Sequence, residues 1–244
     1  MSTKNAIAGA LVALLGATAG ASAATVVVEN VTGAWTNIVG GGTAVTGRNT
    51  NEIFWGVQTA TPKSGLSFAG VSNKAMTAGT VAELGSLTHH NFFTVGTPVS
   101  AARLNLSFDV RIDGELRTVT NAYDFTLLET RNNSRICDNG EPNRQGININ
   151  GCADRMQAIH NADVSETFEI GGKTFVFDID HFGFDLDADG IPTIWTAEEL
   201  QTRVSLTAQF IEIADVAPVP LPASAALLVA GLGGFAALRR RKKA

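Results

Sequence analysis

The stretch RLNLSFDVRID, residues 103–113, alternates polar and apolar side chains at every position. Successive side chains of a β-strand point to opposite faces of its sheet, so this alternation predicts a strand with one buried and one solvent-facing side. Residues 204–210, VSLTAQF, repeat the pattern near the other end of the chain. The two stretches therefore predict amphipathic strands of antiparallel sheets that cover a hydrophobic core.

Shorter apolar and β-branched runs predict additional strands at residues 25–28, 53–57, 66–71, 123–127 and 175–179. The intervening segments are rich in Gly, Asn and Pro, which favour turns, and Gly171-Gly172 predicts a turn into the strand at 175–179. This organisation predicts a mainly β chain with a single antiparallel β-sandwich, jelly-roll-like, over residues 24–217. The one helical signal is the capping-box sequence TAEE at residues 196–199, which predicts a short helical turn after Trp195.

Residues 1–23 have the three parts of a secretory signal peptide. Lys4 supplies a positive charge, residues 6–17 form a short apolar run, and Ala21-Ser22-Ala23 has the small-x-small form that signal peptidase cuts. The apolar run is too short for the rival interpretation, a membrane anchor. We therefore expect export from the cytoplasm and cleavage after Ala23.

Residues 218–244 have the pattern of a second sorting signal, which includes a membrane-spanning segment. A proline motif (Val219, Pro220, Leu221, Pro222, Ala223) precedes an apolar run to Leu238 and the basic cluster RRRKK at residues 239–243. As a helix the run would span roughly 24 Å, less than a hydrocarbon core of about 30 Å, and long basic side chains can make up part of the difference. We expect a transmembrane helix in the inner membrane whose basic end stays cytoplasmic.

The charge of the body differs from that of the whole chain. The net charge is −5, but six of the 18 basic residues lie in the two end segments and all 23 acidic residues lie between them. An acidic body argues against a nucleic-acid partner, since phosphate binding needs clustered Lys and Arg. It suits a soluble protein in an extracellular medium that contains cations.

Two cysteines, Cys137 and Cys152, are the only ones in the chain. The segment between them is rich in Asn, Gly and Pro, and the signal peptide predicts an oxidising compartment, so we expect a disulfide bond that closes this loop. Loop entropy gives such a bond about 3 kcal/mol of stabilisation. A metal site would need closer cysteine pairs or nearby histidines.

The order of proline motif, apolar helix and terminal Arg cluster in residues 219–243 resembles the PEP-CTERM sorting signal, in its VPLPA variant. The resemblance implies recognition by an exosortase, a membrane transpeptidase-like enzyme. The exosortase would cut near the proline motif and release or transfer the body to the cell surface or an extracellular matrix. The alternative is an ordinary C-terminal anchor that is never cut.

A second resemblance covers the body. It is similar to the THxN family of PEP-CTERM proteins, whose signature corresponds here to Thr88, His89 and Asn91, with His90 at the free position. The segments that carry the resemblance are GAWTN at 33–37, FWG at 54–56, LGSLTHHN at 84–91, GCAD at 151–154 and TAEE at 196–199. The family implies a surface or matrix protein of undefined activity, and no catalytic residue is carried over.

The signature also invites a metal or catalytic interpretation. In a strand, however, His89 and His90 would point to opposite faces, so they could not both bind one ion without a turn. We favour a polar strand end in which His89 and Asn91 form hydrogen bonds to the backbone of a neighbouring loop.

Asp185, Asp187 and Asp189, followed by Gly190, are the sharpest candidate metal ligands. Carboxylates at alternate positions before a glycine can surround a hard cation such as calcium. An EF-hand loop also needs a Glu at its twelfth position, where this chain has Thr196. The sequence therefore leaves two alternatives: a weak calcium loop outside the EF-hand pattern, with a dissociation constant of about 10⁻⁴ to 10⁻³ M, or a solvated acidic turn.

Catalytic motifs are incomplete. Residues 65–70 miss the spacing of a nucleophile elbow by one position, and Gly40-Gly41-Gly42 lacks the later residues of a phosphate loop. We therefore expect a non-enzymatic surface or matrix protein, with exopolysaccharide as a candidate partner. The alternatives are a carbohydrate-binding module, with or without calcium, and a secreted hydrolase. The tryptophans Trp35, Trp55 and Trp195 could stack on sugar, but we interpret them as core residues.

Overall fold

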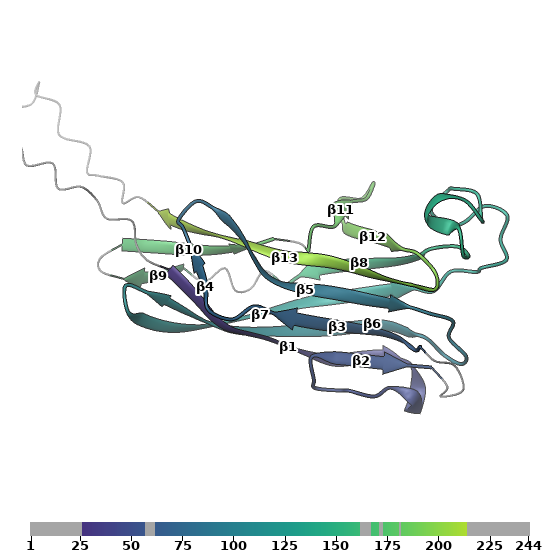
Figure 1. Ribbon diagram of the computed structural model, residues 1–244, viewed down its shortest axis with the longest axis horizontal. Coiled ribbons are helices and arrows are strands. Elements are labelled where there is room, and N and C mark those ends of the chain that lie inside the picture. Colours follow the sequence, from purple (N-terminus) through teal and green to yellow (C-terminus); the bar gives the residue numbers. More distant parts are fainter. Residues whose placement is uncertain (1–25, 57–61, 162–166, 171–172, 181, 214–244) are drawn as a thin grey trace, which may run out of the picture.

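Strands dominate the computed structural model of the chain, which describes residues 26–56, 62–161, 167–170, 173–180 and 182–213 (Figure 1). The predicted signal peptide (1–23) and the sorting tail (218–244) with its proline motif lie outside the described residues. The strands are β1 (Val26–Gly40), β2 (Glu52–Trp55), β3 (Ser64–Gly70), β4 (Lys74–Met76), β5 (Val81–Asn91), β6 (Val99–Ile112), β7 (Glu115–Leu128), β8 (Asp154–His160), β9 (Thr167–Ile170), β10 (Lys173–Ile179), β11 (Asp185–Leu186), β12 (Pro192–Thr196) and β13 (Leu200–Ile213). Two short 3₁₀ turns, η1 (Gly42–Ala44) and η2 (Gly146–Asn148), complete the described elements.

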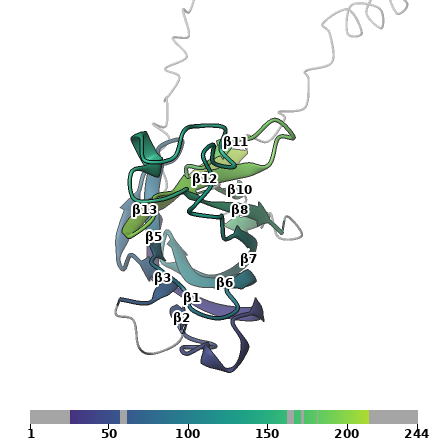
Figure 2. The ribbon, with the colours of Figure 1, turned by 90° about the vertical axis from the view of Figure 1, so that its right-hand side faces the viewer.

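The strands form two antiparallel sheets that face each other, which confirms the predicted β-sandwich (Figure 2). The first sheet has the order β11-β12-β8-β7-β6-β1-β4, and the second has the order β2-β3-β5-β13-β10-β9. Strands β6 and β7 form a long hairpin in which Ile112 pairs with Glu115. The two residues between them, Asp113 and Gly114, have φ values of 48° and 93°. An Asp-Gly pair accepts positive φ at low cost, and such turns match the twist of the flanking strands.

The decisive alternation has its predicted consequence. On β6, Leu104, Leu106, Phe108, Val110 and Ile112 are all buried, whereas the residues between them are at least partly exposed. On β13, Leu206, Ala208 and Phe210 are buried in the same way. The two strands belong to different sheets, so their apolar faces close the core from opposite sides.

Aromatic side chains from both sheets fill the core. The ring of Phe108 on β6 lies 5.3 Å from that of Phe177 on β10, which joins the two layers. Trp35 is fully buried and packs against Phe125, with 5.3 Å between ring centroids. Trp55 is 2% exposed, so the interpretation of Trp35 and Trp55 as core residues is confirmed, whereas Trp195 is only partly buried.

A short turn at residues 197–199 carries the chain from one sheet to the other. Thr196 ends β12 in the first sheet, and Leu200 begins β13 in the second. The predicted helical turn at this point is wrong, because three residues must cross between the sheets and Glu199 has a φ of 59°. Glu198, assigned to a capping box, is 1% exposed and turned into the protein.

The described chain begins and ends at the same end of the sandwich. The start of β1 and the end of β13 both lie at the left of Figure 1, and the loop between β7 and β8 lies at the opposite end. No helix within the described residues is long and apolar enough to cross a membrane.

Candidate functional site

His89 lies near the end of β5 and faces the interior. Its side chain is 3% exposed, and its ring stacks on Trp55 with 6.5 Å between centroids and 26° between planes. The Nδ1 atom lies 2.8 Å from the hydroxyl oxygen of Thr196 on β12. Burial, and secondarily the neighbouring His90, lowers the pKa of His89 to about 3. The ring is therefore neutral near pH 7 and acts as a structural hydrogen-bonding group.

The last residue of β5, Asn91, completes the connection to β12. Its Nδ2 atom donates a hydrogen bond of 3.0 Å to the carbonyl oxygen of Thr196. The Thr196 hydroxyl donates in turn to the carbonyl oxygen of Asp154 at 3.2 Å. Asn91 thus bonds to the backbone of a neighbouring element, as expected, whereas the partner of His89 is a side-chain hydroxyl.

The two histidines of the signature do not share a site. His90 points to the other face of β5, where its Nε2 atom lies 2.9 Å from the hydroxyl of Ser67 and its ring lies 5.2 Å from that of Phe54. Thr88 lies in the strand between its cross-strand partners Ser67 and Arg203. The signature therefore links sheets and strands, and it does not supply two histidine ligands to one ion.

Three carboxylates meet beside this hydrogen-bonded chain. One oxygen from each of Glu129, Asp154 and Glu198 lies within 4.8 Å of the others. Strand pairing explains the approach: Leu128 pairs with Arg155, which places Glu129 beside the start of β8, and Asp154 pairs with Thr196. We call Glu129, Asp154 and Glu198 the acidic cluster. Its members follow β7, begin β8 and occupy the turn between β12 and β13.

The acidic cluster is mostly withdrawn from solvent. Asp154 is 5% exposed and Glu198 is 1% exposed, whereas Glu129 is at the surface. One oxygen of Asp154 accepts a hydrogen bond of 2.7 Å from the backbone N–H of Thr130. By contrast, Oε1 of Glu198 is buried and has no hydrogen-bond partner among the described residues. A buried carboxylate oxygen without a donor is costly, so this atom needs an explanation.

Electrostatics in the acidic cluster disfavour three negative charges. Burial, then repulsion from Glu129, raises the pKa of Asp154 to about 8, against the opposing hydrogen bond from Thr130. Although Glu129 is exposed as a residue, partial loss of water around its carboxyl, and then repulsion from Glu198, raises its pKa to about 7. Burial also raises the pKa of Glu198, although the amides of Asn132 and Asn91 oppose this shift. Within the described part of the chain, no Lys or Arg forms an ion pair with these carboxylates.

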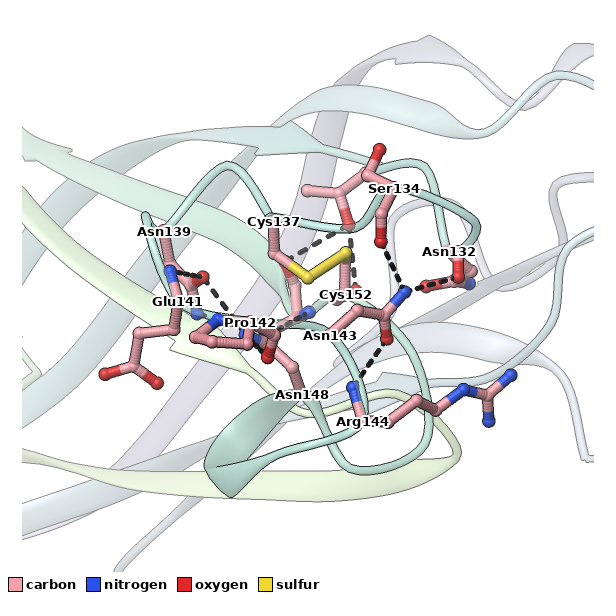
Figure 3. Close-up of a disulfide and its surroundings, with 12 residues drawn as sticks. Asn132, Ser134, Cys137, Asn139, Glu141, Pro142, Asn143, Arg144, Asn148 and Cys152 are labelled. Carbon is pink, nitrogen blue, oxygen red and sulfur yellow. Dashed lines mark hydrogen bonds between the residues drawn. A yellow bond between two sulfur atoms is a disulfide. The ribbon is translucent and has the colours of Figure 1, made fainter.

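The loop between β7 and β8 connects two members of the acidic cluster, Glu129 and Asp154. The predicted disulfide bond between Cys137 and Cys152 is present, and both residues are buried (Figure 3). Asn148 is fully buried inside the loop, where its side chain exchanges two 3.1 Å hydrogen bonds with that of Asn139. The Asn148 Oδ1 atom also accepts a bond of 2.9 Å from the N–H of Ala153. The disulfide and these amides fix the path of the chain into Asp154.

Two residues of the loop, Asn132 and Gly151, lie beside Glu198. Asn143 Nδ2 donates 2.8 Å bonds to the carbonyl oxygens of Asn132 and Ser134, which holds Asn132 in place (Figure 3). A Cβ atom on Gly151 would lie 2.5 Å from Oδ1 of Asn132 and 3.1 Å from Cγ of Glu198. The absence of a side chain at Gly151 therefore leaves room for both residues beside the acidic cluster.

The predicted calcium ligands Asp185, Asp187 and Asp189 lie elsewhere, around the β11–β12 hairpin. Oδ1 of Asp187 accepts hydrogen bonds from the N–H groups of Asp189 and Ile191, at 3.0 and 2.9 Å. Its Oδ2 atom accepts bonds from Gln157 and Thr193, both at 3.0 Å. These bonds lower the pKa of Asp187, with the Ile191 N–H as the largest cause. Among the described residues, the three aspartates do not form a group of converging ligand atoms, and this geometry favours a capped acidic turn.

No known family model matches the chain, and no curated protein is significantly similar to it. The geometry nevertheless relates several segments that were singled out in the sequence. Parts of FWG (54–56), THHN (88–91), GCAD (151–154) and TAEE (196–199) meet around His89, Thr196 and the acidic cluster. Sequence reasoning assigned no role to Asp154, placed Glu198 in a helix cap and did not single out Glu129.

Proposed function

We propose that this chain is the precursor of a non-enzymatic protein of the cell surface or extracellular matrix. Signal peptidase removes residues 1–23, and an exosortase processes the tail near Val219 to Ala223. The observation that supports export most directly is the Cys137–Cys152 disulfide bond, because such bonds persist in oxidising compartments and are rare in the cytosol.

The arrangement of the body agrees with this proposal. Strand β13 leads from the turn beside the acidic cluster to Ile213, where the description of the chain ends, and its 14 residues cover roughly 45 Å. The closed loop of Cys137 and Cys152 lies at the end of the sandwich away from Ile213 (Figure 1). A precursor held by its C-terminal tail would thus present the disulfide loop and the acidic cluster away from the membrane.

Intact-mass analysis of the protein from cells and from medium tests the proposal. We expect a mature form that starts at Ala24 and lacks the basic cluster at residues 239–243. In a strain without the exosortase, the tail should remain and the protein should stay in the membrane fraction. Identical C-terminal masses in the two strains would mean that the tail is an ordinary anchor.

A second candidate function, carbohydrate binding, is favoured by one feature of the first sheet. Strands β1, β6 and β7 form a hollow of about 480 Å³ with a mostly apolar lining, at which Thr32, Asn105, Ser107, Thr120 and Asn161 supply hydroxyl and amide groups. Hydroxyl and amide groups of this kind can exchange hydrogen bonds with a polysaccharide. Binding on a glycan array that is lost in an Asn105→Ala variant would support this function. An array without any binding would leave the structural role as the function.

A further inference from the structure

We propose that Glu129, Asp154 and Glu198 bind a calcium ion, which joins three strand ends at the disulfide end of the sandwich. The first support is geometric. The three carboxylate oxygens lie within 4.8 Å of one another, although they come from distant parts of the chain. Calcium–oxygen distances are about 2.3 to 2.6 Å, so oxygens on opposite sides of the ion lie about 4.6 to 5.2 Å apart. Three oxygens that all lie within 4.8 Å of one another therefore fit inside one such coordination sphere.

The second and independent support is the orphaned oxygen of Glu198. The residue is 1% exposed, and its Oε1 atom has no hydrogen-bond donor. Its carboxylate also contributes to the converging group with Glu129 and Asp154. A buried carboxylate is stabilised by protonation, by hydrogen bonds or by a positive partner. None of the described basic side chains forms an ion pair with the acidic cluster, and a bound cation would supply the positive partner that these carboxylates lack.

The donor chemistry selects the class of ion. The cluster offers carboxylate oxygens, which suit hard cations such as calcium and magnesium. Softer metals prefer thiolate or imidazole ligands, but both cysteines are in the disulfide bond and His89 is bonded to Thr196. Magnesium–oxygen distances are shorter, about 2.0 to 2.1 Å, and magnesium demands a stricter octahedron. Carboxylates from three separate backbone segments therefore favour calcium, with water in the remaining positions.

A calcium ion at this site would connect the two sheets through its carboxylate ligands. Asp154 belongs to β8 and Glu129 follows β7, both in the first sheet, whereas Glu198 leads directly into β13 of the second sheet. Asn91 on β5 holds the same turn through Thr196. The ion would thus fasten the turn that crosses between the sheets, and it would order the disulfide loop that leads into Asp154.

Metal analysis and thermal unfolding of the mature protein recovered from cells test the site. After chelation and dialysis, we expect one calcium ion per chain at saturation. Calcium at ten times its dissociation constant should raise Tm by about 3 to 6 °C, and magnesium at the same concentration should raise it less. Absence of both a Tm shift and a bound ion would overturn the proposal. The three carboxyl groups, whose pKa values are raised, would then be protonated acids that share hydrogen bonds.

Variants locate the ion. Glu198→Gln should weaken calcium binding at least tenfold, and Glu129→Gln, at the protein surface, provides a second test if the first variant fails to fold. The matched control is Asp187→Asn, in the β11–β12 hairpin, which should bind calcium as the wild type does. If Asp187→Asn abolishes binding while Glu129→Gln leaves it unchanged, the ion is bound at the hairpin and the acidic cluster is not its site.

Discussion

The amide nitrogen of Asn91 donates a 3.0 Å hydrogen bond to the carbonyl oxygen of Thr196, and both residues are buried. This bond attaches the end of β5, in one sheet, to the end of β12, in the other. Thr196 is two positions before Glu198, so the bond also fixes the turn that carries the acidic cluster. Asn91, at the end of the segment Thr88 to Asn91, therefore has a structural role in the contact between the two sheets.

Replacement of Asn91 tests that role. Asn91→Ala removes the donor and leaves the Thr196 carbonyl oxygen buried without this partner, which should lower the free energy of unfolding by about 1 to 3 kcal/mol. Asn105→Ala is the control, because Asn105 is exposed and its amide donates a hydrogen bond to the Thr36 hydroxyl at the surface. That change should stay within about 0.5 kcal/mol. Urea unfolding measures both, and equal losses would argue against a special role for the Asn91 bond.

His89 should make the protein sensitive to acid. Burial lowers its pKa from 6.5 to about 3 in the folded state, whereas the unfolded chain retains a pKa near 6.5. Below pH 6.5, His89 is therefore protonated in the unfolded state but stays neutral in the folded state. His89 contributes full stability above pH 6.5, and this contribution falls by up to about 1.4 kcal/mol per pH unit on acidification toward pH 3.

His89→Gln isolates this contribution. Gln cannot titrate, so the stability difference between wild type and variant should shrink steadily from pH 6.5 toward pH 4. The control is His90→Gln, since His90 is only partly buried and bonds to Ser67 on the other face of β5. Unfolding at a series of pH values measures both differences. A wild-type advantage that does not change with pH would show that His89 titrates similarly in the folded and unfolded chains.

The disulfide bond should contribute strongly to the order of the β7–β8 loop. Cys137 and Cys152 are 15 residues apart, and loop entropy alone gives their bond about 3 kcal/mol. Replacement of both by Ser should therefore lower Tm by roughly 6 to 12 °C. Differential scanning calorimetry measures the change, and intact mass with and without reductant should differ by two hydrogens. Two free thiols in freshly isolated protein would contradict the bond.

Local patterns predicted the strands whose faces are uniform. The alternation in β6 and β13 survives in the structure because each strand buries one side only. In β5, by contrast, Leu84, Gly85, Ser86 and Leu87 are buried in succession, and the pairing with β13 shifts register between Leu206 and Thr207. The irregular pairing and the burial of both faces of β5 hide the alternation expected of a strand. The sequence therefore predicted only a polar strand end at Thr88 to Asn91.

The acidic cluster could not be predicted from spacing. Glu129, Asp154 and Glu198 are far apart in the chain and meet only because β7 pairs with β8 and β8 pairs with β12. The spacing is more suggestive for Asp185, Asp187 and Asp189. In the structure, however, both oxygens of Asp187 accept hydrogen bonds within and beside the hairpin turn. Local spacing thus singled out carboxylates that do not converge, because convergence depends on the order of the strands in the sheets.

Asp187 provides the last prediction. Its carboxylate accepts hydrogen bonds from two backbone N–H groups inside the turn and from the side chains of Gln157 and Thr193. Asp187→Ala removes all four acceptor contacts, so it should lower Tm and increase hydrogen exchange at the N–H groups of Asp189 and Ile191. The change should appear equally with calcium and with chelator, because the bonds hold the turn without an ion.

Asp189→Ala is the matched control in the same turn. The Asp189 side chain is exposed, and its backbone N–H is the group that bonds to Asp187. Its replacement should leave Tm and the exchange rates of the turn nearly unchanged. If Asp187→Ala and Asp189→Ala instead destabilise the protein only when calcium is present, these aspartates act as ligands and the hairpin is a calcium loop. A loss confined to Asp187, at either calcium level, identifies a capped turn.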